Sequence, residues 1–162
     1  MAPTERTTPK IQRDEFARQL GNNIGMPGIK GDDWSALFLL LHKETLQGRV
    51  VILLDEISWI GSKDYDFLGK LKNAWDLYFK KNEQLILIIC GSASSWIDKN
   101  ILSSTAFLGR ISYTMSLEEL SLRDAVKFWG NSKNIAVYEK LKVLSVLGGV
   151  PRYLEEINPN IS

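Results

Sequence analysis

The sequence predicts an α/β protein, with a parallel sheet flanked by helices and followed by a small helical region. Two uninterrupted apolar runs, Val50–Leu54 and Leu85–Cys90, have the length and the β-branched content of strands that are buried on both faces of a parallel sheet. A third strand is expected at residues 111–115, after Gly109-Arg110. Segments with helical spacing of apolar residues alternate with these strands. This alternation is the pattern from which the fold class follows.

The first 31 residues are predicted to form a polar leader, a short helix and a glycine-rich loop. Residues 1–10 are polar and contain several Pro and Thr residues, which is typical of a disordered segment or an added leader. Apolar residues then share one side of a helix over about residues 13–20. Residues 21–31 contain four glycines and a proline, which indicates a loop.

Residues 32–115 are predicted to form the α/β core. Asp32 or Asp33 could cap a helix that carries an apolar face before the first strand. A second helix is expected over about residues 65–80, and its aromatic residues have the spacing of core residues. The second strand ends in a run of small residues, Gly91–Ser95. The core is therefore expected to alternate helix, strand, helix, strand and strand.

Residues 116–162 are predicted to form a small helical region. Ser116 and Glu119 have the spacing of a capping box and would open the first of its helices. The last helix is expected over about residues 137–147. It would stop at Gly148-Gly149-Val150-Pro151, since glycine followed by proline ends helices efficiently.

Composition sets further limits on function. The chain has 162 residues, 44% of them hydrophobic and 24% charged, which is typical of one ordinary globular domain. A net charge of +1 gives no electrostatic argument for nucleic acid or an anionic membrane. No apolar stretch approaches the roughly 20 residues that span a bilayer, and the N-terminus has no signal-peptide core, so we expect a cytoplasmic protein.

Two residue types that often carry chemistry occur once each. His42 is the single histidine, so a multi-histidine metal site or a Ser-His-Asp triad lacks the residues it needs. Cys90 is the single cysteine, which rules out a disulfide framework within the chain. Because Cys90 ends an apolar run, we expect it to be a buried packing residue rather than a nucleophile.

The sharpest functional signal is the acidic pair Asp55-Glu56, directly after the first strand. Ligands of open α/β sheets bind outside the carboxyl ends of the strands. There, one carboxylate can hold Mg²⁺ through its water shell, and the next can orient or deprotonate an attacking water. The alternative interpretation is that the pair is simply the polar start of a surface turn.

Four further blocks of the sequence follow one another: VVILLDE (50–56), LILIICGSASSW (85–96), FLGRISYTMSLEELSLRDAVKFW (107–129) and GGVPRYL (148–154). In this order they resemble the archaeal-type ATPases, a family of AAA+/STAND-like P-loop NTPases. The first block resembles the Walker B strand, the second the sensor-1 strand with its turn, the third the Gly-Arg block and the fourth the lid motif. The resemblance implies part of an ASCE-type P-loop NTPase sheet, with strand order 5-1-4-3-2, followed by a helical lid.

The resemblance also implies roles for individual residues. Asp55 would bind Mg²⁺ and the nucleotide, and Glu56 would be the catalytic base. Ser92 would be the polar sensor near the γ-phosphate, or alternatively an ordinary turn residue. Arg110 would stabilise phosphate charge, also from a neighbouring subunit of a homo-oligomer, or alternatively be a surface arginine. Pro151 would lie in the lid against the adenine, or alternatively only end a helix.

The sequence departs from this family in one respect. No G-x-x-x-x-G-K-[ST] phosphate-binding loop occurs, and the nearest approximation, residues 25–31, has the wrong spacing. We therefore expect this chain to bind ATP weakly or not at all. It would be the C-terminal part of an ATP-hydrolysing domain, coupled to an effector domain or partner of unknown kind. The alternative is a degenerate, non-catalytic module that keeps the fold for protein interaction.

The missing strands carry a structural expectation. In the implied strand order, the strand of the phosphate-binding loop separates the strand at residues 85–90 from the one at 111–115. Unpaired strand edges are unfavourable because their backbone groups lack partners. We therefore expect these two strands to pair directly, or the N-terminal segment to fill the gap.

Overall fold

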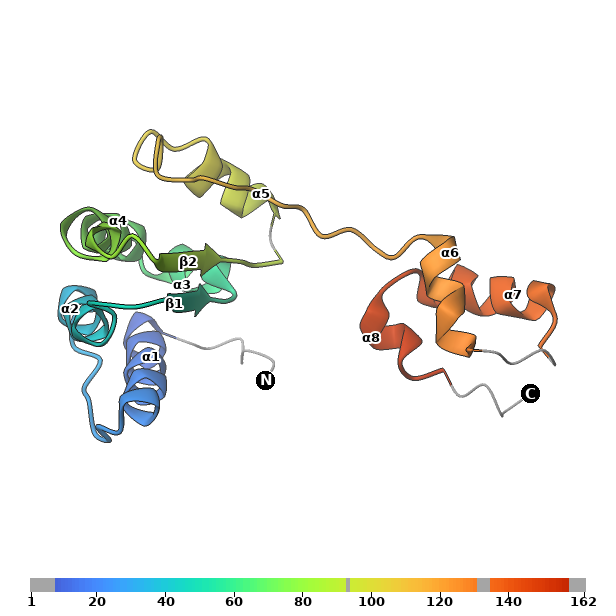
Figure 1. Cartoon of the computed structure of the whole chain (residues 1–162), viewed down its shortest axis with the longest axis horizontal. Helices are drawn as coiled ribbons and strands as arrows, with labels where there is room; N and C mark the ends of the chain where they lie inside the picture. Colours follow the sequence, from blue (N-terminus) through green and yellow to red (C-terminus); the bar gives the residue numbers. More distant parts are fainter. Residues whose placement is uncertain (1–7, 93, 131–134, 158–162) are drawn as a thin grey trace. The chain divides into compact units, whose positions relative to one another are not determined.

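The computed structural model describes residues 8–92, 94–130 and 135–157. The chain divides into two compact units, residues 1–112 and residues 113–162 (Figure 1). The first unit contains the sheet and most of the helices, and the second contains helices only in its described part. No helix of the described residues is both long and apolar enough to cross a lipid bilayer.

A two-stranded parallel sheet organises the first unit. Strands β1 (Val50–Leu54) and β2 (Leu85–Ile89) pair in register, from Val50 opposite Leu85 to Leu54 opposite Ile89. Both strands and their parallel pairing are as predicted. The register has a consequence for function, because the residues that follow each strand leave the sheet at the same edge.

The helices of the first unit lie around this sheet (Figure 1). They are α1 (Pro9–Ile24), α2 (Trp34–Glu44), α3 (Ile57–Lys63), α4 (Asp66–Leu77), η1 (Phe79–Lys81), α5 (Ser94–Ile97) and the π-helical η2 (Asp98–Leu102). Asp32 or Asp33 was predicted to cap the helix before the first strand, and Asp33 caps α2. Its carboxylate accepts hydrogen bonds from the backbone N–H groups of Ser35 and Ala36, at 2.8 and 3.2 Å.

Helix α1 is longer than the sequence pattern indicated, at both ends. Thr8 caps it and Pro9 occupies its first turn, a position where proline loses no helical hydrogen bond. At the other end Gly21 remains helical and buried, and the helix ends only at Gly25, which has the left-handed backbone (φ 69°). The polar leader, disordered or added, was predicted over residues 1–10, but residues 9–10 belong to α1. The predicted loop over residues 21–31 was wrong for residues 21–24, which are also part of this helix.

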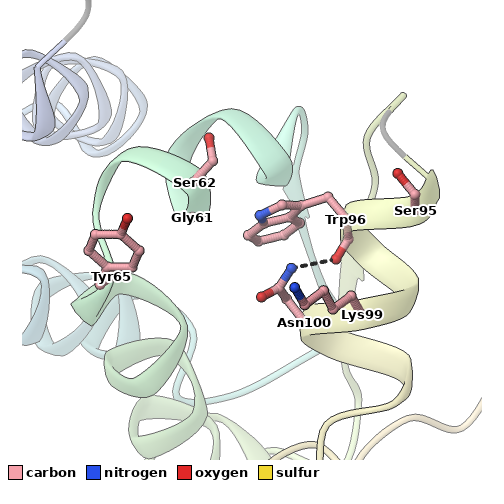
Figure 2. A pocket seen from close by; sticks show the side chains of 7 residues that line it. All are labelled: Gly61, Ser62, Tyr65, Ser95, Trp96, Lys99 and Asn100. Carbon is pink, nitrogen blue, oxygen red and sulfur yellow. Dashed lines mark hydrogen bonds between the residues drawn. The ribbon is translucent and has the colours of Figure 1, made fainter.

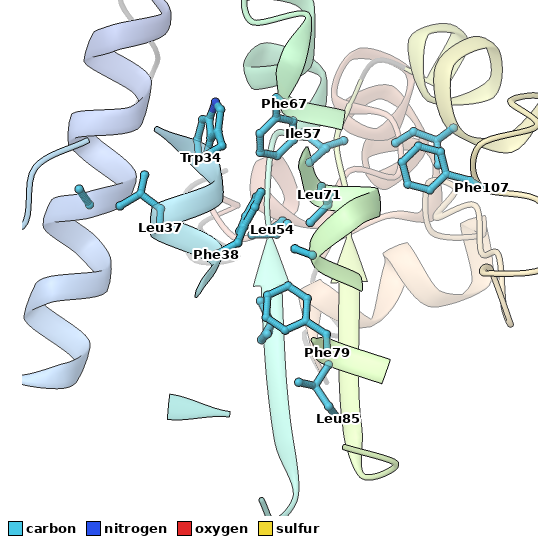
Figure 3. Packing of buried hydrophobic residues seen from close by; sticks show 14 residues of the cluster. Trp34, Leu37, Phe38, Leu54, Ile57, Phe67, Leu71, Phe79, Leu85 and Phe107 are labelled. Carbon is cyan, nitrogen blue, oxygen red and sulfur yellow. The ribbon is translucent and has the colours of Figure 1, made fainter. Parts of the chain in front are cut away.

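The core of the first unit is aromatic and lies on the covered face of the sheet. The rings of Trp34 and Phe38 on α2 stack 5.7 Å apart, and Phe67 on α4 packs edge-on against Trp34 at 4.7 Å. Figure 3 shows these rings against the strands, where Leu54 and Leu85 point into the same cluster. The predicted helix faces thus form the core.

The opposite face of the sheet carries four exposed apolar side chains. Val51 and Leu53 of β1 and Ile86 and Ile88 of β2 are between 43% and 59% exposed. The prediction that both strands are buried on both faces was therefore wrong within the described residues. Continuous apolar runs are typical of strands that lie between two helical layers. Here the described residues cover only one face of the sheet with helices.

The third predicted strand does not form. Residues 111–115 form no regular secondary structure, and Ile111, Tyr113 and Met115 are exposed. Alternation of apolar residues is not sufficient for a strand, because a strand also needs a neighbour for its backbone hydrogen bonds. Neither expected remedy is present in the described part of the chain: there β2 pairs with β1 only, and the N-terminal residues from Pro9 onward form helix α1.

The second unit is built from short helices around a small core. They are α6 (Leu122–Ala125), η3 (Val126–Trp129), α7 (Val137–Leu147) and α8 (Pro151–Leu154). Helix α7 and its termination at Gly148 are as predicted. The capping box is not, since Ser121 rather than Ser116 caps the first helix, and Glu119 instead accepts a hydrogen bond from the backbone N–H of Gly149 at 2.9 Å.

The pair Gly148-Gly149 has a local structural reason. The backbone N–H of Leu120 donates to the carbonyl oxygen of Gly149 at 2.8 Å, so two chain segments approach closely. A Cβ atom on Gly149 would lie 2.3 Å from the carbonyl oxygen of Leu120. The glycine pair is thus required by packing within the second unit.

Candidate functional site

The turn after β1 holds the two carboxylates at the carboxyl edge of the sheet. Asp55 is exposed and Glu56 is half-buried. Glu56 has left-handed backbone angles, φ 52° and ψ 40°, and is the one non-glycine residue with positive φ in the described part of the chain. Helix α3 begins at the next residue, Ile57. The sharp change of direction from strand to helix therefore occurs at the predicted catalytic base.

One oxygen of the Asp55 carboxylate is held and the other is open. Oδ1 accepts hydrogen bonds from the backbone N–H of Glu56 at 2.8 Å and from Sγ of Cys90 at 3.0 Å. These two donors, the thiol first, keep the pKa of Asp55 below its ordinary value, so the group is a carboxylate at neutral pH. Oδ2 has no hydrogen-bond partner among the described residues.

The second strand brings Ser92 to the same place. Its Oγ donates a hydrogen bond to Oε2 of Glu56 at 3.4 Å, across two turns that are 36 residues apart in sequence. The structure thus brings together three of the five predicted site residues: Asp55, Glu56 and Ser92. Each follows one of the two paired strands, which is the arrangement expected from their parallel register.

Cys90 is a member of this cluster that the sequence interpretation missed. It is half-buried rather than a closed packing residue, and its thiol faces Asp55. The neighbouring carboxylate, together with partial burial, raises the pKa of Cys90 to about 11, so the thiol keeps its proton and is a poor nucleophile. The parallel register was the available signal, because Asp55 and Cys90 directly follow the paired residues Leu54 and Ile89.

Arg110 does not join this cluster. Its guanidinium donates Nε and Nη2 to the two carboxylate oxygens of Asp76 on α4, both at 2.9 Å. This bidentate pair, with Lys72 at 3.1 Å from the same carboxylate, holds the pKa of Asp76 well below its usual range. In this structure Arg110 therefore fixes the segment after η2 to helix α4.

Pro151 lies in the second unit, at the first position of α8. That position suits proline because its missing N–H would have no helical partner. The local geometry is therefore sufficient to explain Pro151 without a ligand.

A shallow pocket of about 490 Å³ lies elsewhere in the first unit, between α3 and the segment of α5 and η2 (Figure 2). The ring of Trp96 lies so close to Gly61 that a Cβ atom there would be 2.3 Å from the ring. Asn100 donates its side-chain amide to the carbonyl oxygen of Trp96 at 2.8 Å. None of the predicted site residues lines this pocket, so it is separate from the carboxylate cluster.

Comparison with known proteins identifies the family. No curated protein and no solved structure matches the chain. Residues 4–157 match the family described as an ATPase domain predominantly from Archaea, which is the family that the four sequence blocks resemble. The match covers nearly the whole sequence, from before α1 to the last described residue. The chain therefore belongs to this archaeal-type ATPase family.

Proposed function

We propose that the chain supplies the metal-binding and water-activating half of an ATP-hydrolysing domain. Membership of an ATPase family implies use of a nucleotide and a metal in general. The observation that supports the finer proposal is the meeting of Asp55, Glu56 and Ser92 at the carboxyl edge of two parallel strands. Open α/β sheets bind their nucleotides at this edge, so carboxylates that lie there are placed to act on a nucleotide.

The donor set fits a magnesium ion carried by a nucleotide. Asp55 is a deprotonated carboxylate with one open oxygen, and oxygen ligands are those that Mg²⁺ prefers. The described residues include no group of three or more His, Cys, Asp or Glu residues that could form a complete metal cage. This matches Mg²⁺, which commonly takes one or two carboxylates and completes its shell with water and phosphates.

In the proposed reaction each residue has a separate role. Asp55 would hold the metal through its open Oδ2, and Glu56 would accept the proton of the water that attacks the γ-phosphate. Ser92 holds Oε2 of Glu56, which leaves Oε1 free to accept that proton. Bound Mg²⁺ would supply charge neutralisation at the phosphates.

The phosphate-binding loop has to come from residues outside this sequence. The 162 residues contain no G-x-x-x-x-G-K-[ST] motif. The exposed apolar face of the sheet supports the same proposal, since a further helical layer would bury Val51, Leu53, Ile86 and Ile88. We therefore propose that this chain corresponds to one part of the catalytic domain and is inactive alone.

Two further roles belong to the proposal. Arg110 would stabilise phosphate charge, in its own domain or from a neighbouring subunit, once its guanidinium leaves Asp76. Pro151 would contact the adenine from the helical region. A C-terminal effector domain or a protein partner would use the energy of hydrolysis.

The test uses a completed chain, in which a strand, a G-x-x-x-x-G-K-[ST] loop, its helix and the next strand from another family member precede residue 8. Steady-state ATP turnover and nucleotide binding are measured for Glu56→Gln and for the matched control Glu83→Gln. Glu83 is an exposed carboxylate at the opposite end of β2. We expect Glu56→Gln to lower turnover about a hundredfold or more with binding retained, and Glu83→Gln to change neither.

The same measurement distinguishes the proposed ATP hydrolysis from the alternative function, protein interaction without catalysis. The absence of the phosphate-binding loop and the exposed apolar face also fit a non-catalytic module that binds another protein. If the completed chain binds ATP, and its Glu56→Gln variant hydrolyses ATP at the same rate as the unsubstituted completed chain, Glu56 is not the catalytic base. A completed chain that binds no nucleotide would favour the interaction module.

A further inference from the structure

Cys90 occupies a position that the proposed reaction does not explain. Its backbone is fixed on both sides of the acidic turn: its N–H donates to the carbonyl oxygen of Leu54, and its carbonyl oxygen accepts from the N–H of Ile57, both at 3.0 Å. Residues 54 and 57 directly flank Asp55 and Glu56. The end of β2 therefore clamps the turn that presents the two carboxylates.

The side chain continues this clamp to the Asp55 carboxylate. Sγ donates to Oδ1 at 3.0 Å, and the N–H of Glu56 donates to the same oxygen at 2.8 Å. The two donors follow the ends of different strands, and together they fix the torsion angles of the Asp55 side chain. Both act on one oxygen, so the other oxygen is left open in a defined direction.

We infer that Cys90 is a positioning residue, whose thiol turns the Asp55 carboxylate so that Oδ2 faces the divalent cation. This inference rests on the proposed function, because it assigns Asp55 to the cation. Hydrogen-bond partners behind a metal ligand commonly determine its orientation, and their loss lowers metal affinity by about tenfold or more. Cys90 therefore contributes through Asp55 and does not itself contact the cation or the nucleotide.

Three substitutions separate hydrogen bonding from packing. Cys90→Ser keeps a donor of similar size, Cys90→Ala removes the donor, and Cys90→Val replaces it with a larger apolar group. If the thiol acts as a donor, Ser retains the function while Ala and Val lose it. If Cys90 only fills space, Val is tolerated at least as well as Ser, because a hydrogen-bond donor then contributes nothing and Val fills the site.

The measurement is the binding of Mn²⁺, together with a non-hydrolysable ATP analogue that supplies its phosphate ligands, to the ¹⁵N-labelled completed chain. Binding is followed by paramagnetic broadening of the amide signals of Glu56 and Gly91. We expect the wild-type chain and Cys90→Ser to bind Mn²⁺ within twofold of each other. Cys90→Ala and Cys90→Val should bind roughly tenfold more weakly. Amide chemical shifts of the remaining chain report whether each variant is folded.

The outcomes distinguish this inference from the proposed function. Asp55→Asn serves as the reference that removes the ligand. If Asp55→Asn abolishes local broadening but Cys90→Ala and Cys90→Val bind as wild type does, the role of Cys90 is overturned and the metal role of Asp55 stands. If wild type shows no broadening at Glu56 and Gly91, the metal role of Asp55 is overturned, and the inference with it.

Discussion

Two aspartates of the first unit, Asp55 and Asp64, are nine residues apart and have opposite surroundings. Asp64 is buried, and its carboxylate accepts hydrogen bonds from the guanidinium of Arg13, from Nε1 of Trp34 at 2.9 Å and from the backbone N–H of Asp66 at 3.3 Å. Asp55 is exposed and has one oxygen without a described partner. Full pairing in the interior is typical of a structural role, whereas an open oxygen at a sheet edge is available for a ligand.

The contrast extends to the elements that each aspartate connects. Through Arg13, which also donates Nε to the carbonyl oxygen of Gly31 at 3.1 Å, Asp64 ties α1 and the loop before α2 to the end of α3. Asp55 connects only the ends of β1 and β2. The lesson is that the more strongly bonded carboxylate holds the fold, and the less strongly bonded one is the candidate for chemistry.

The largest expected effect is on stability at Asp64. Asp64→Ala leaves Arg13 and Trp34 without their buried acceptor, so we expect it to lower the free energy of unfolding by about 3 kcal/mol or more. The control Asp55→Ala should change it by less than about 1 kcal/mol, because the group is exposed. Urea unfolding at pH 7 measures both values. Equal losses would remove the distinction between the two aspartates.

The next largest effect is the loss of stability expected on substitution of Gly31, which lies in the region that Asp64 holds together through Arg13. A Cβ atom there would lie 2.3 Å from the backbone carbon of Arg13, so Gly31→Ala must displace α1 and should lower stability by about 2 kcal/mol. The matched control is Gly69→Ala in α4, where a Cβ atom meets nothing within 4 Å. That change should stabilise the chain by up to about 1 kcal/mol, as alanine favours a helix interior. Thermal unfolding monitored by circular dichroism would show opposite shifts. A stable Gly31→Ala chain would argue against this close contact.

A smaller effect on stability is expected from the backbone conformation of Glu56, the residue next to Asp55. Glu56 has a left-handed backbone, which is unfavourable by about 1 kcal/mol for any residue with a Cβ atom. Glu56→Gly and Glu56→Ala both remove the carboxylate, so their difference reports the backbone alone. We expect Glu56→Gly to be the more stable by about 1 kcal/mol in chemical unfolding, although glycine is normally the less stable of the two. The reverse order would show that the turn is not held in this conformation.

The smallest effect concerns acid stability. The pKa of Asp76 is lowered by Arg110, so its stabilising contribution is fully present above the unfolded pKa of about 4 and is lost as pH falls through the lower folded value. We expect the unfolding midpoint of wild type to fall more steeply than that of Arg110→Ala as the solution is acidified below about pH 4. Parallel curves would show that the pair does not form in solution.

The sequence predicted the parts of the fold that local patterns determine. Both strands were found from their apolar runs, and α2 and α7 from their spacing and their end signals, Asp33 and Gly148. Helix α3 was not predicted, because its seven residues include Gly61 and are too few to show a helical spacing of apolar residues. The strand at 111–115 failed because pairing depends on a partner strand, which the alternation of Ile111, Tyr113 and Met115 cannot supply.

The candidate site was predictable to the extent that it depends on the sheet. Asp55, Glu56 and Ser92 follow the two strands, so a correct register brings them together. Arg110 was not predictable in the same way, because its ion pair with Asp76 arises from packing between segments 34 residues apart. Cys90 was judged by its apolar neighbours in sequence, whereas its partner lies across the sheet.

The most direct test of the central claim is a crystal structure of the completed chain with Mg²⁺ and a non-hydrolysable ATP analogue. We expect a Mg²⁺ whose water shell contacts Oδ2 of Asp55, and a γ-phosphate that faces Glu56 and Ser92. A nucleotide bound with its phosphates away from Asp55, for example in the pocket at Trp96, would contradict the assignment of this sheet edge as the catalytic site.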